Sequence, residues 1–462
     1  MSILNNSFIS VGTKIIQALL SIVSAVFLSR LIMPHDFGVF SIILATYGLF
    51  RGFLDVGLTA SYIKADRVTQ GLRNSFFTIN VLLGITTTIL LIASAPIISF
   101  VYGDAQLFSL MIAFSSTVFI SSLGLQGLAE LNRAKSFSKL MIINVVTTLG
   151  TVLISIGAAY SGLGVWTFII AEFSRTSLQT GLVFYFNTDN KYNFAKSSLI
   201  KVYSKEIKFG AQVFFGRILN GIFYSMDKLL LGNGINANSL GQYKNSQQHA
   251  RMVDSHLRMP IGSVIYSYIE RYSDKDKKST YFKFGIITLI ITMMANGLLF
   301  LKGEEIYLFA FGDNWKEASI FIKYFSMFSM GIVLKGIYTT ISMSEDKMNK
   351  QNALTLISIL ILGLNILIYF IYDISLLNFV KFFSISIFLY WSIMLTKEFY
   401  SFNSKNPFLI YITLSISIVG FCEIVRQFAV IDPINNFFLI TFLYEFLMGL
   451  LLFYYIKIGI KK

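Results

Sequence analysis

The sequence of 462 residues has little of the chemistry on which soluble enzymes and metalloproteins depend. Its single cysteine, Cys422, excludes a disulfide within the chain and a cysteine-rich metal site. Its three histidines, His35, His249 and His256, are too scattered for a recognisable metal motif. Charged residues make up only 13% of the chain, and acidic residues, 24 against 38 basic ones, are the scarcer sign. We therefore expect no metal and no cofactor.

Apolar residues, by contrast, are abundant. They make up 55% of the chain, and the mean hydropathy is +0.67, beyond the range of a soluble globular protein. The apolar runs are long and continuous, which favours membrane-spanning helices over the short alternating segments of a barrel. We expect an all-α polytopic membrane protein with about 14 transmembrane helices. Their predicted centres are Leu20, Phe50, Leu90, Phe119, Leu149, Phe173, Gly221, His256, Met294, Met330, Leu362, Ile387, Ile418 and Leu450.

Basic residues are distributed unevenly among the breaks between these runs. If the N-terminus is cytoplasmic, the even-numbered breaks and the C-terminal tail hold most lysines and arginines. The odd-numbered breaks hold fewer, chiefly Arg30, Lys244, Lys302 and Lys316, together with several acids. This positive-inside pattern predicts that both termini are cytoplasmic. It also explains most of the net charge of +14 without a nucleic-acid partner.

The two halves of the chain repeat one another. The stretch LSRLIMPHDFGVF (28–40) matches LLLGNGINANSLGQY (229–243), and the offset between Gly38 and Gly241 is 241 − 38 = 203 residues. FVYGD (100–104) similarly matches FAFGD (309–313). Such repeats are typical of transporters, and they predict two six-helix lobes around a central cavity. The predicted parts are an N-terminal lobe at 1–187, a cytoplasmic amphipathic connector at 188–209, a C-terminal lobe at 210–397 and a two-helix appendage at 398–462.

Charged residues recur at helical spacing within the apolar runs, where an isolated charge is costly unless it faces protein or water. Their excess of cations predicts an anionic ligand, because guanidinium groups bind phosphate oxygens with paired hydrogen bonds. The candidate substrate-binding cations are Lys14, Arg51, Arg217, Arg251 and Arg258. The candidates for ion pairs or for binding a coupling ion are Asp55, Glu172, Arg175, Asp227 and Asp254.

Two of these acid–base pairs, Arg51 with Asp55 and Glu172 with Arg175, have a purely structural alternative, in which they fix contacts between helices. Other lysines are interpreted as reaching the membrane interface, since a long aliphatic stem lets the ammonium leave the apolar region. These lysines are Lys228, Lys323, Lys335 and Lys381.

Four stretches together resemble the polysaccharide transporter family of the multidrug/oligosaccharidyl-lipid/polysaccharide flippase superfamily, which includes Wzx-type O-antigen flippases. They are LSRLIMPHDFGVFSIILA, FLDVGLTASYIKADRVT, MDKLLLGNGINANSLGQY and FGDNWKEA, and the likeness covers roughly 4–397. The resemblance implies two lobes whose cavity opens alternately to each side. It implies that the chain moves undecaprenyl-diphosphate-linked oligosaccharide repeat units, of O-antigen, capsule or exopolysaccharide, to the outer leaflet of a bacterial plasma membrane. The family's cationic cavity residues are carried over to the five cations named above.

Several alternatives stay open. A flippase for peptidoglycan lipid precursors would share the anionic diphosphate, whereas an exporter of cationic drugs would need an acidic cavity. A membrane enzyme such as an O-antigen polymerase or ligase would handle the same lipids, but usually carries a large outer loop. The longest outer break here, at 302–317, is short, so we expect a transporter and not an enzyme. The expected partners are the lipid-linked oligosaccharide, membrane lipid and the polymerase of the same glycan pathway, and the expected state is a monomer.

Overall fold

The computed structural model describes residues 3–402, apart from short gaps. The gaps are residues 55, 57–58, 60–61, 63–67, 188–191, 195–203, 263–273 and 345–346. Nearly all of the described residues are helical, and none of them forms a strand. The two C-terminal helices predicted near Ile418 and Leu450 lie outside the described residues.

The predicted helical architecture is confirmed, because every predicted centre from Leu20 to Ile387 falls within a described helix. In the part of the chain that the structure describes, nine helices are long and apolar enough to cross a membrane. The helices are α1 (Ile3–Leu31), α2 (Pro34–Phe50), η1 (Arg51–Leu54), α4 (Gln70–Tyr102), α5 (Gln106–Arg133), α6 (Phe137–Tyr160), α7 (Trp166–Phe186), α8 (Ser204–Gly232), α9 (Ala237–Ala250), η3 (Asp254–Arg258), α11 (Asp274–Phe311), η4 (Asp313–Trp315), α12 (Lys316–Ser344), α13 (Met348–Ile371) and α14 (Leu376–Phe402).

Helix α4 shows how the sequence sets the ends of a span. Thr69 precedes the helix and its hydroxyl oxygen accepts a hydrogen bond from the backbone N–H of Leu72, which satisfies a donor of the first turn. Gly103 follows the helix in the left-handed region, with φ of 64°, where a glycine is favoured. Between these ends lie 33 residues, or about 50 Å of helix, more than the hydrocarbon core of a bilayer requires.

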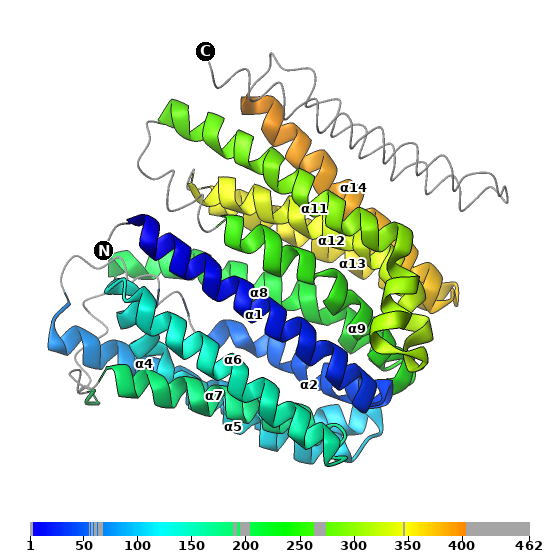
Figure 1. Cartoon of the computed structure of the whole chain (residues 1–462), viewed down its shortest axis with the longest axis horizontal. Coiled ribbons are helices and arrows are strands. Elements are labelled where there is room, and N and C mark those ends of the chain that lie inside the picture. Colours follow the sequence, from blue (N-terminus) through cyan, green and yellow to red (C-terminus); the bar gives the residue numbers. More distant parts are fainter. Residues whose placement is uncertain are drawn as a thin grey trace. The chain divides into compact units, whose positions relative to one another are not determined.

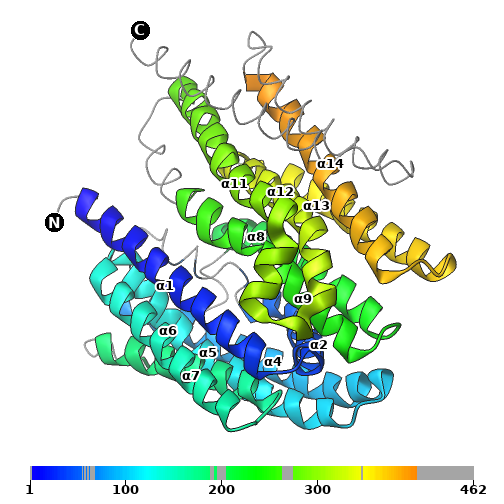
Figure 2. The ribbon, with the colours of Figure 1, turned by 45° about the vertical axis from the view of Figure 1, so that its right-hand side comes forward.

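The chain divides into two compact units. Unit 1 holds the described residues of Met1–Asn245, Phe309–Glu317 and Met348–Leu362, and unit 2 holds those of Ser246–Leu308, Ala318–Lys347 and Gly363–Lys462. In unit 1, α1 packs on α6, α6 and α5 pack on α7, α4 packs on α5, and α2 packs on α8 (Figure 1). In unit 2, Gly331 of α12 lies against the backbone of Phe388 in α14, with α11 alongside (Figure 2). The lobe boundaries drawn from the sequence remain a prediction.

The repeat is visible in the packing of unit 1. A Cβ atom on Gly38 would overlap the carbonyl oxygen of Ala237, and a Cβ atom on Gly241 would overlap the carbonyl oxygen of Pro34. The two contacts are reciprocal under the predicted offset, because 34 + 203 = 237 and 38 + 203 = 241. The first turns of α2 and α9 therefore cross at equivalent glycines, where the backbones touch.

A third segment, formed by the end of α11 and η4, contacts the turn between α1 and α2. The indole Nε1 of Trp315 donates to the carbonyl oxygen of Ser29 at 2.6 Å. Arg30 donates from Nη2 to the carbonyl oxygen of Phe309 at 2.6 Å and from Nε to that of Ala310 at 2.9 Å. These carbonyls belong to the last turn of α11, where carbonyl oxygens have no hydrogen-bond partner within the helix. Arg30 therefore caps the C-terminal end of α11.

The glycine crossing leads to a test of packing. We expect Gly38→Ala and Gly241→Ala each to destabilise the protein by roughly 1–3 kcal/mol or more, because the added methyl meets rigid backbone. The measurement is thermal unfolding of the purified protein in detergent. Gly181→Ala is the matched control, since a Cβ atom at Gly181 meets nothing within 4 Å. Equal melting temperatures for all three variants would contradict the crossing.

Candidate functional site

The chain after α9 departs from regular α-helical geometry. Arg251 is in a turn after α9 and residues 252–253 are helical. Asp254–Arg258 form a single π-helical turn, η3, in which the backbone N–H of Met259 donates to the carbonyl oxygen of Asp254. A π turn holds an extra residue, so it shifts the faces that the side chains after it present, and such turns are frequent at functional sites. The predicted position of a helix around His256 is therefore confirmed, but one of its turns is π-helical and not α-helical.

Arg258 and Asp254 form a bidentate ion pair on this turn. Arg258 Nε donates to Asp254 Oδ1, and Nη2 donates to Oδ2 at 3.1 Å. Asp254 is only 3% exposed. The two parallel hydrogen bonds are charge-assisted, and they satisfy both oxygens of a carboxylate that would otherwise be buried without a partner.

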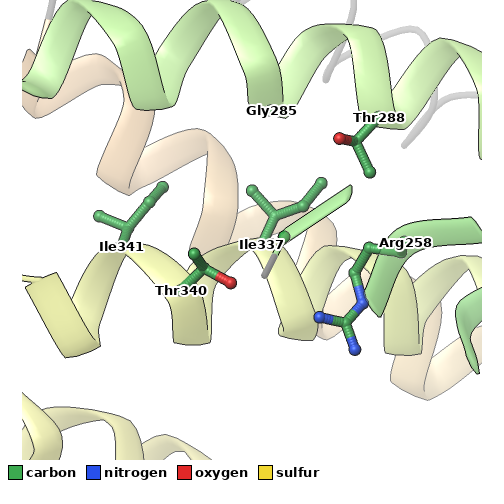
Figure 3. A pocket seen from close by; sticks show the side chains of 7 residues that line it. Arg258, Gly285, Thr288, Ile337, Thr340 and Ile341 are labelled. Atoms are coloured by element: carbon green, nitrogen blue, oxygen red, sulfur yellow. The ribbon is translucent and has the colours of Figure 1, made fainter. Parts of the chain in front are cut away.

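A glycine on α12 makes room for the guanidinium group. A Cβ atom on Gly336 would overlap Cζ and Nε of Arg258, so the planar group lies directly on the helix backbone. Arg258 also lines a pocket with a cavity volume of about 20 Å³, room for about one water (Figure 3). Figure 3 shows Thr288 of α11 across from Arg258, and Thr340 farther along α12, beyond Ile337. The other lining residues are Gly262, Gly285, Ile337 and Ile341.

Two further cations act on the same site. Lys335 of α12 is 4% exposed, and its Nζ lies 5.9 Å from the ring centroid of Trp391. Both Arg251 and Asp254 are close enough to act on its charge. The interpretation of Lys335 as an interfacial lysine was wrong, because the side chain is enclosed within unit 2. Among the described residues, the cluster holds the basic side chains of Arg251, Arg258 and Lys335 and the carboxylate of Asp254.

Unit 1 holds a second buried pair. Lys228 Nζ lies 2.9 Å from both carboxylate oxygens of Asp227, and the hydroxyl of Tyr243 donates to Asp227 Oδ2 at 2.7 Å. The prediction that Lys228 reaches the membrane interface was wrong, because the ammonium turns inward to its neighbour and to the carbonyl oxygen of Tyr224. Asp227 thus has a structural partner that its sequence position did not reveal.

Lys244 belongs to the same part of unit 1. It had been assigned to an outer break, but it lies within α9 and is buried. Its Nζ sits over two rings of α2, 5.3 Å from the centroid of Phe37 and 6.0 Å from that of Phe40. Desolvated cation–π contacts of this kind contribute roughly 2 kcal/mol, which helps to offset the burial of the charge.

The remaining candidates lie on the helices of unit 1. Glu172 and Arg175 of α7 form the predicted ion pair, with Arg175 Nε donating to Glu172 Oε2 at 2.9 Å. Both residues, and Arg51 at the start of η1, act electrostatically on Tyr47 of α2. All three charges thus act on one tyrosine, whereas Asp55, the predicted partner of Arg51, lies outside the described residues. The side chains of Lys14, Arg51 and Arg217 are exposed.

The sequence reasoning missed two buried carboxylates, Glu130 and Glu398. Glu130 near the end of α5 accepts hydrogen bonds from Arg73 Nε at 2.8 Å, from the Tyr62 hydroxyl at 3.1 Å and from the Tyr192 hydroxyl at 3.0 Å. Burial, followed by the negative charge of Glu130, raises the pKa of Tyr62 to about 12 and raises that of Tyr192 further, so both phenols remain donors. Tyr192 also stacks on Phe77. Glu130 thereby ties the first described residues after α7 to this end of unit 1.

The Asp227–Lys228 pair allows a test of whether Asp227 has a structural role or binds a coupling ion. We expect Lys228→Met to lower the free energy of unfolding by about 3–5 kcal/mol, because Asp227 would be left buried without its cation. The double variant, with Asp227→Leu added, should regain most of that stability, since no charge then remains. The measurement is thermal unfolding in detergent together with transport.

The transport readout separates the two roles. If the stable double variant transports normally, Asp227 is structural, as its geometry indicates. A double variant that folds and does not transport would contradict that assignment and would make Asp227 the residue that binds a coupling ion.

Comparisons with known proteins identify the family of the chain. Residues 27–320 match the family model described as "Polysaccharide biosynthesis protein". Over 311 residues the chain is 22% identical to the lipopolysaccharide biosynthesis protein WzxC of Escherichia coli K12, and the match spans 67% of this chain and 63% of that relative. The fold is similar to that of the lipid II flippase MurJ in an inward closed conformation, with a TM-score of 0.67, 16% identity and full coverage of both chains.

A second solved structure shares the fold nearly as well. It is a multidrug resistance transporter of the MATE family in an inward-facing conformation, with a TM-score of 0.65 and 13% identity over 86% of this chain and 99% of that one. Both likenesses concern the fold alone. The predicted family membership is confirmed by the match to the family model, and the choice of substrate is left to the chemistry of the site.

Proposed function

Because this chain belongs to the polysaccharide biosynthesis protein family, we propose that it is a flippase for undecaprenyl-diphosphate-linked oligosaccharide repeat units. It would move these units, destined for O-antigen, capsule or exopolysaccharide, from the inner to the outer leaflet of a bacterial plasma membrane. The observation that carries the proposal is the buried cluster of Arg251, Arg258 and Lys335 around one carboxylate.

The chemistry of this cluster suits a diphosphate. A phosphate group that leaves water loses strong hydration, which only charged hydrogen-bond donors can replace. Arg258 presents such donors in a pocket that Thr288 and Thr340 also line. The cavity is about 20 Å³, room for about one water. A diphosphate would therefore bind only where the helices around the pocket separate, and the glycan and the polyprenyl chain would lie outside it.

Alternating access completes the proposal. Transporters built from repeats expose one central site to the two membrane faces in turn. The positive-inside pattern orients the chain with both termini in the cytoplasm, so loading would occur from the inner leaflet. The expected monomer, and the polymerase of the same pathway as a partner, belong to this proposal.

The sign of the cluster favours an anion over the alternatives. An exporter of cationic drugs has the same fold, but a site with three cations and one acid repels such a substrate. A flippase for peptidoglycan precursors fits the cluster equally, since the lipid carries the same diphosphate. Transport of a lipid makes and breaks no covalent bond, whereas a polymerase or a ligase does both.

The test is restoration of surface glycan in a bacterium that lacks its own flippase. The native chain should restore glycan, and Arg258→Ala should reduce it by about ten-fold or more, because a charged hydrogen bond to the substrate contributes roughly 1.5–3 kcal/mol. Arg258→Lys should retain only part of the activity, since an ammonium cannot make the two parallel bonds. Membrane abundance is measured for every variant.

Gly336→Ala tests the same site without altering a charge. Its methyl group would displace the guanidinium of Arg258, so we expect transport to fall towards that of Arg258→Ala at near-normal stability. Gly181→Ala serves as the control. Full activity in both Arg258→Ala and Gly336→Ala would overturn the assignment of this site, and failure of the native chain across several hosts would overturn the flippase.

A further inference from the structure

Two hydrogen-bonded contacts within unit 1 join the two halves of the sequence, and the repeat relates them to each other. The hydroxyl of Tyr102, in the last turn of α4, donates at 2.6 Å to the carbonyl oxygen of Leu229, in the last turn of α8. Arg30, in the last turn of α1, donates to the carbonyl oxygens of Phe309 and Ala310, in the last turn of α11. The stretches that end α4 and α11, FVYGD and FAFGD, match in the sequence. The repeat therefore produces the same contact twice, with the donor on the other partner.

The acceptors in these contacts are carbonyl oxygens of a last helical turn, where they have no hydrogen-bond partner within the helix. Breaking the contacts therefore costs no bond inside a helix, and water can replace the lost donor. The four helix ends lie next to odd-numbered breaks, which the positive-inside pattern assigns to the outer side of the membrane. Contacts of this kind can open and close reversibly.

We infer that these two contacts are the latches of an outer gate: they hold the outer ends of the two predicted lobes together, and both must break before the protein opens outward. The inference rests on the proposed function, because alternating access requires the lobes to separate at each membrane face in turn. The latched turns lead directly into α2 and α9, whose first turns cross at Gly38 and Gly241. Since these glycines have no side chain with which to bond, the latches supply the directional bonds that keep the crossing closed.

The experiment follows a cysteine reporter that lies behind the gate. Ser41 is 1% exposed and lies one turn after Gly38 on the same face of α2, so a cysteine at this position is reached when the crossing opens. The full chain carries Cys422→Ser, and the probe is a membrane-impermeant maleimide added to spheroplasts. A second reporter, Met33→Cys, stands at a position that is 60% exposed and measures access that needs no opening.

We expect Tyr102→Phe to raise the labelling rate of Ser41→Cys by about two- to ten-fold, which is the effect of one lost hydrogen bond on the open population. Arg30→Ala should raise the rate similarly through the second latch. Because both latches hold one gate, the two effects should multiply in the double variant. Tyr160→Phe is the matched control, since it removes an exposed hydroxyl at the end of α6, outside the latches.

Three results would overturn the inference. The first is labelling of Ser41→Cys that is no faster in Tyr102→Phe and Arg30→Ala, or no faster in the double variant than in the faster single one. The second is equally accelerated labelling of Ser155→Cys, a position in α6 that is 2% exposed, because the variants would then loosen the whole fold. The third is Met33→Cys that reacts only after the membrane is broken, which would assign this end to the cytoplasm.

Surface glycan, measured for the same variants in the flippase-deficient host, separates this inference from the proposed function. Labelling that follows the latches in a chain that restores no glycan in any host would overturn the flippase and leave the gate. Restored glycan together with labelling that does not respond to the latches would leave the flippase standing and remove the gate.

Discussion

A charge buried in a medium of low dielectric constant must have a partner, and this constraint governs the interior of the protein. At an effective dielectric constant of about 20, two opposite charges 4 Å apart attract by roughly 4 kcal/mol, whereas an unpaired ion costs more than a folded protein can usually tolerate. Glu130, Glu172, Asp227 and Asp254 obey the rule, since each is held by an arginine or a lysine. The four pairs differ in what they connect, and that difference bears on how the protein moves.

Three of the pairs lie within single helical segments. Asp227 pairs with the next residue, Glu172 with a residue three positions on, and Asp254 with one four positions on. A pair carried by one helix travels with it, so sliding and tilting of helices need not expose a lone charge. Glu130 is different, because its partners come from three other segments of the chain, and it fixes those segments to one another. Among the described residues, the buried acids thus include both pairs within one helix and pairs between segments, of which Glu398 with Lys347 at 4.0 Å is another.

The features that depend on composition and local pattern could be predicted from the sequence. The features that depend on the direction in which a side chain points could not. Helix positions and the repeat offset follow from long apolar runs and from glycines such as Gly38 and Gly241, which no alternative residue could replace. The burial of Lys228 and Lys335 could not be predicted, because a lysine side chain is long enough to point either outward or inward, and only the neighbouring helices determine which direction it takes. The π turn was equally hidden, since Asp254–Arg258 is mostly polar and gives no hydrophobic periodicity in which a shift could be seen.

The same limits explain why fold and substrate must be argued separately here. A lipid flippase and a multidrug transporter match the backbone with TM-scores of 0.67 and 0.65, so the helical scaffold does not distinguish an anionic from a cationic substrate. The distinction has to come from a few buried charged groups. A small number of mutations can invert their summed charge without any change to the helices. Among the described residues, Asp254 shares its site with Arg251, Arg258 and Lys335. Under the proposed function, an anionic substrate would be bound through this excess of basic side chains, so its selection would depend on them and not on the scaffold.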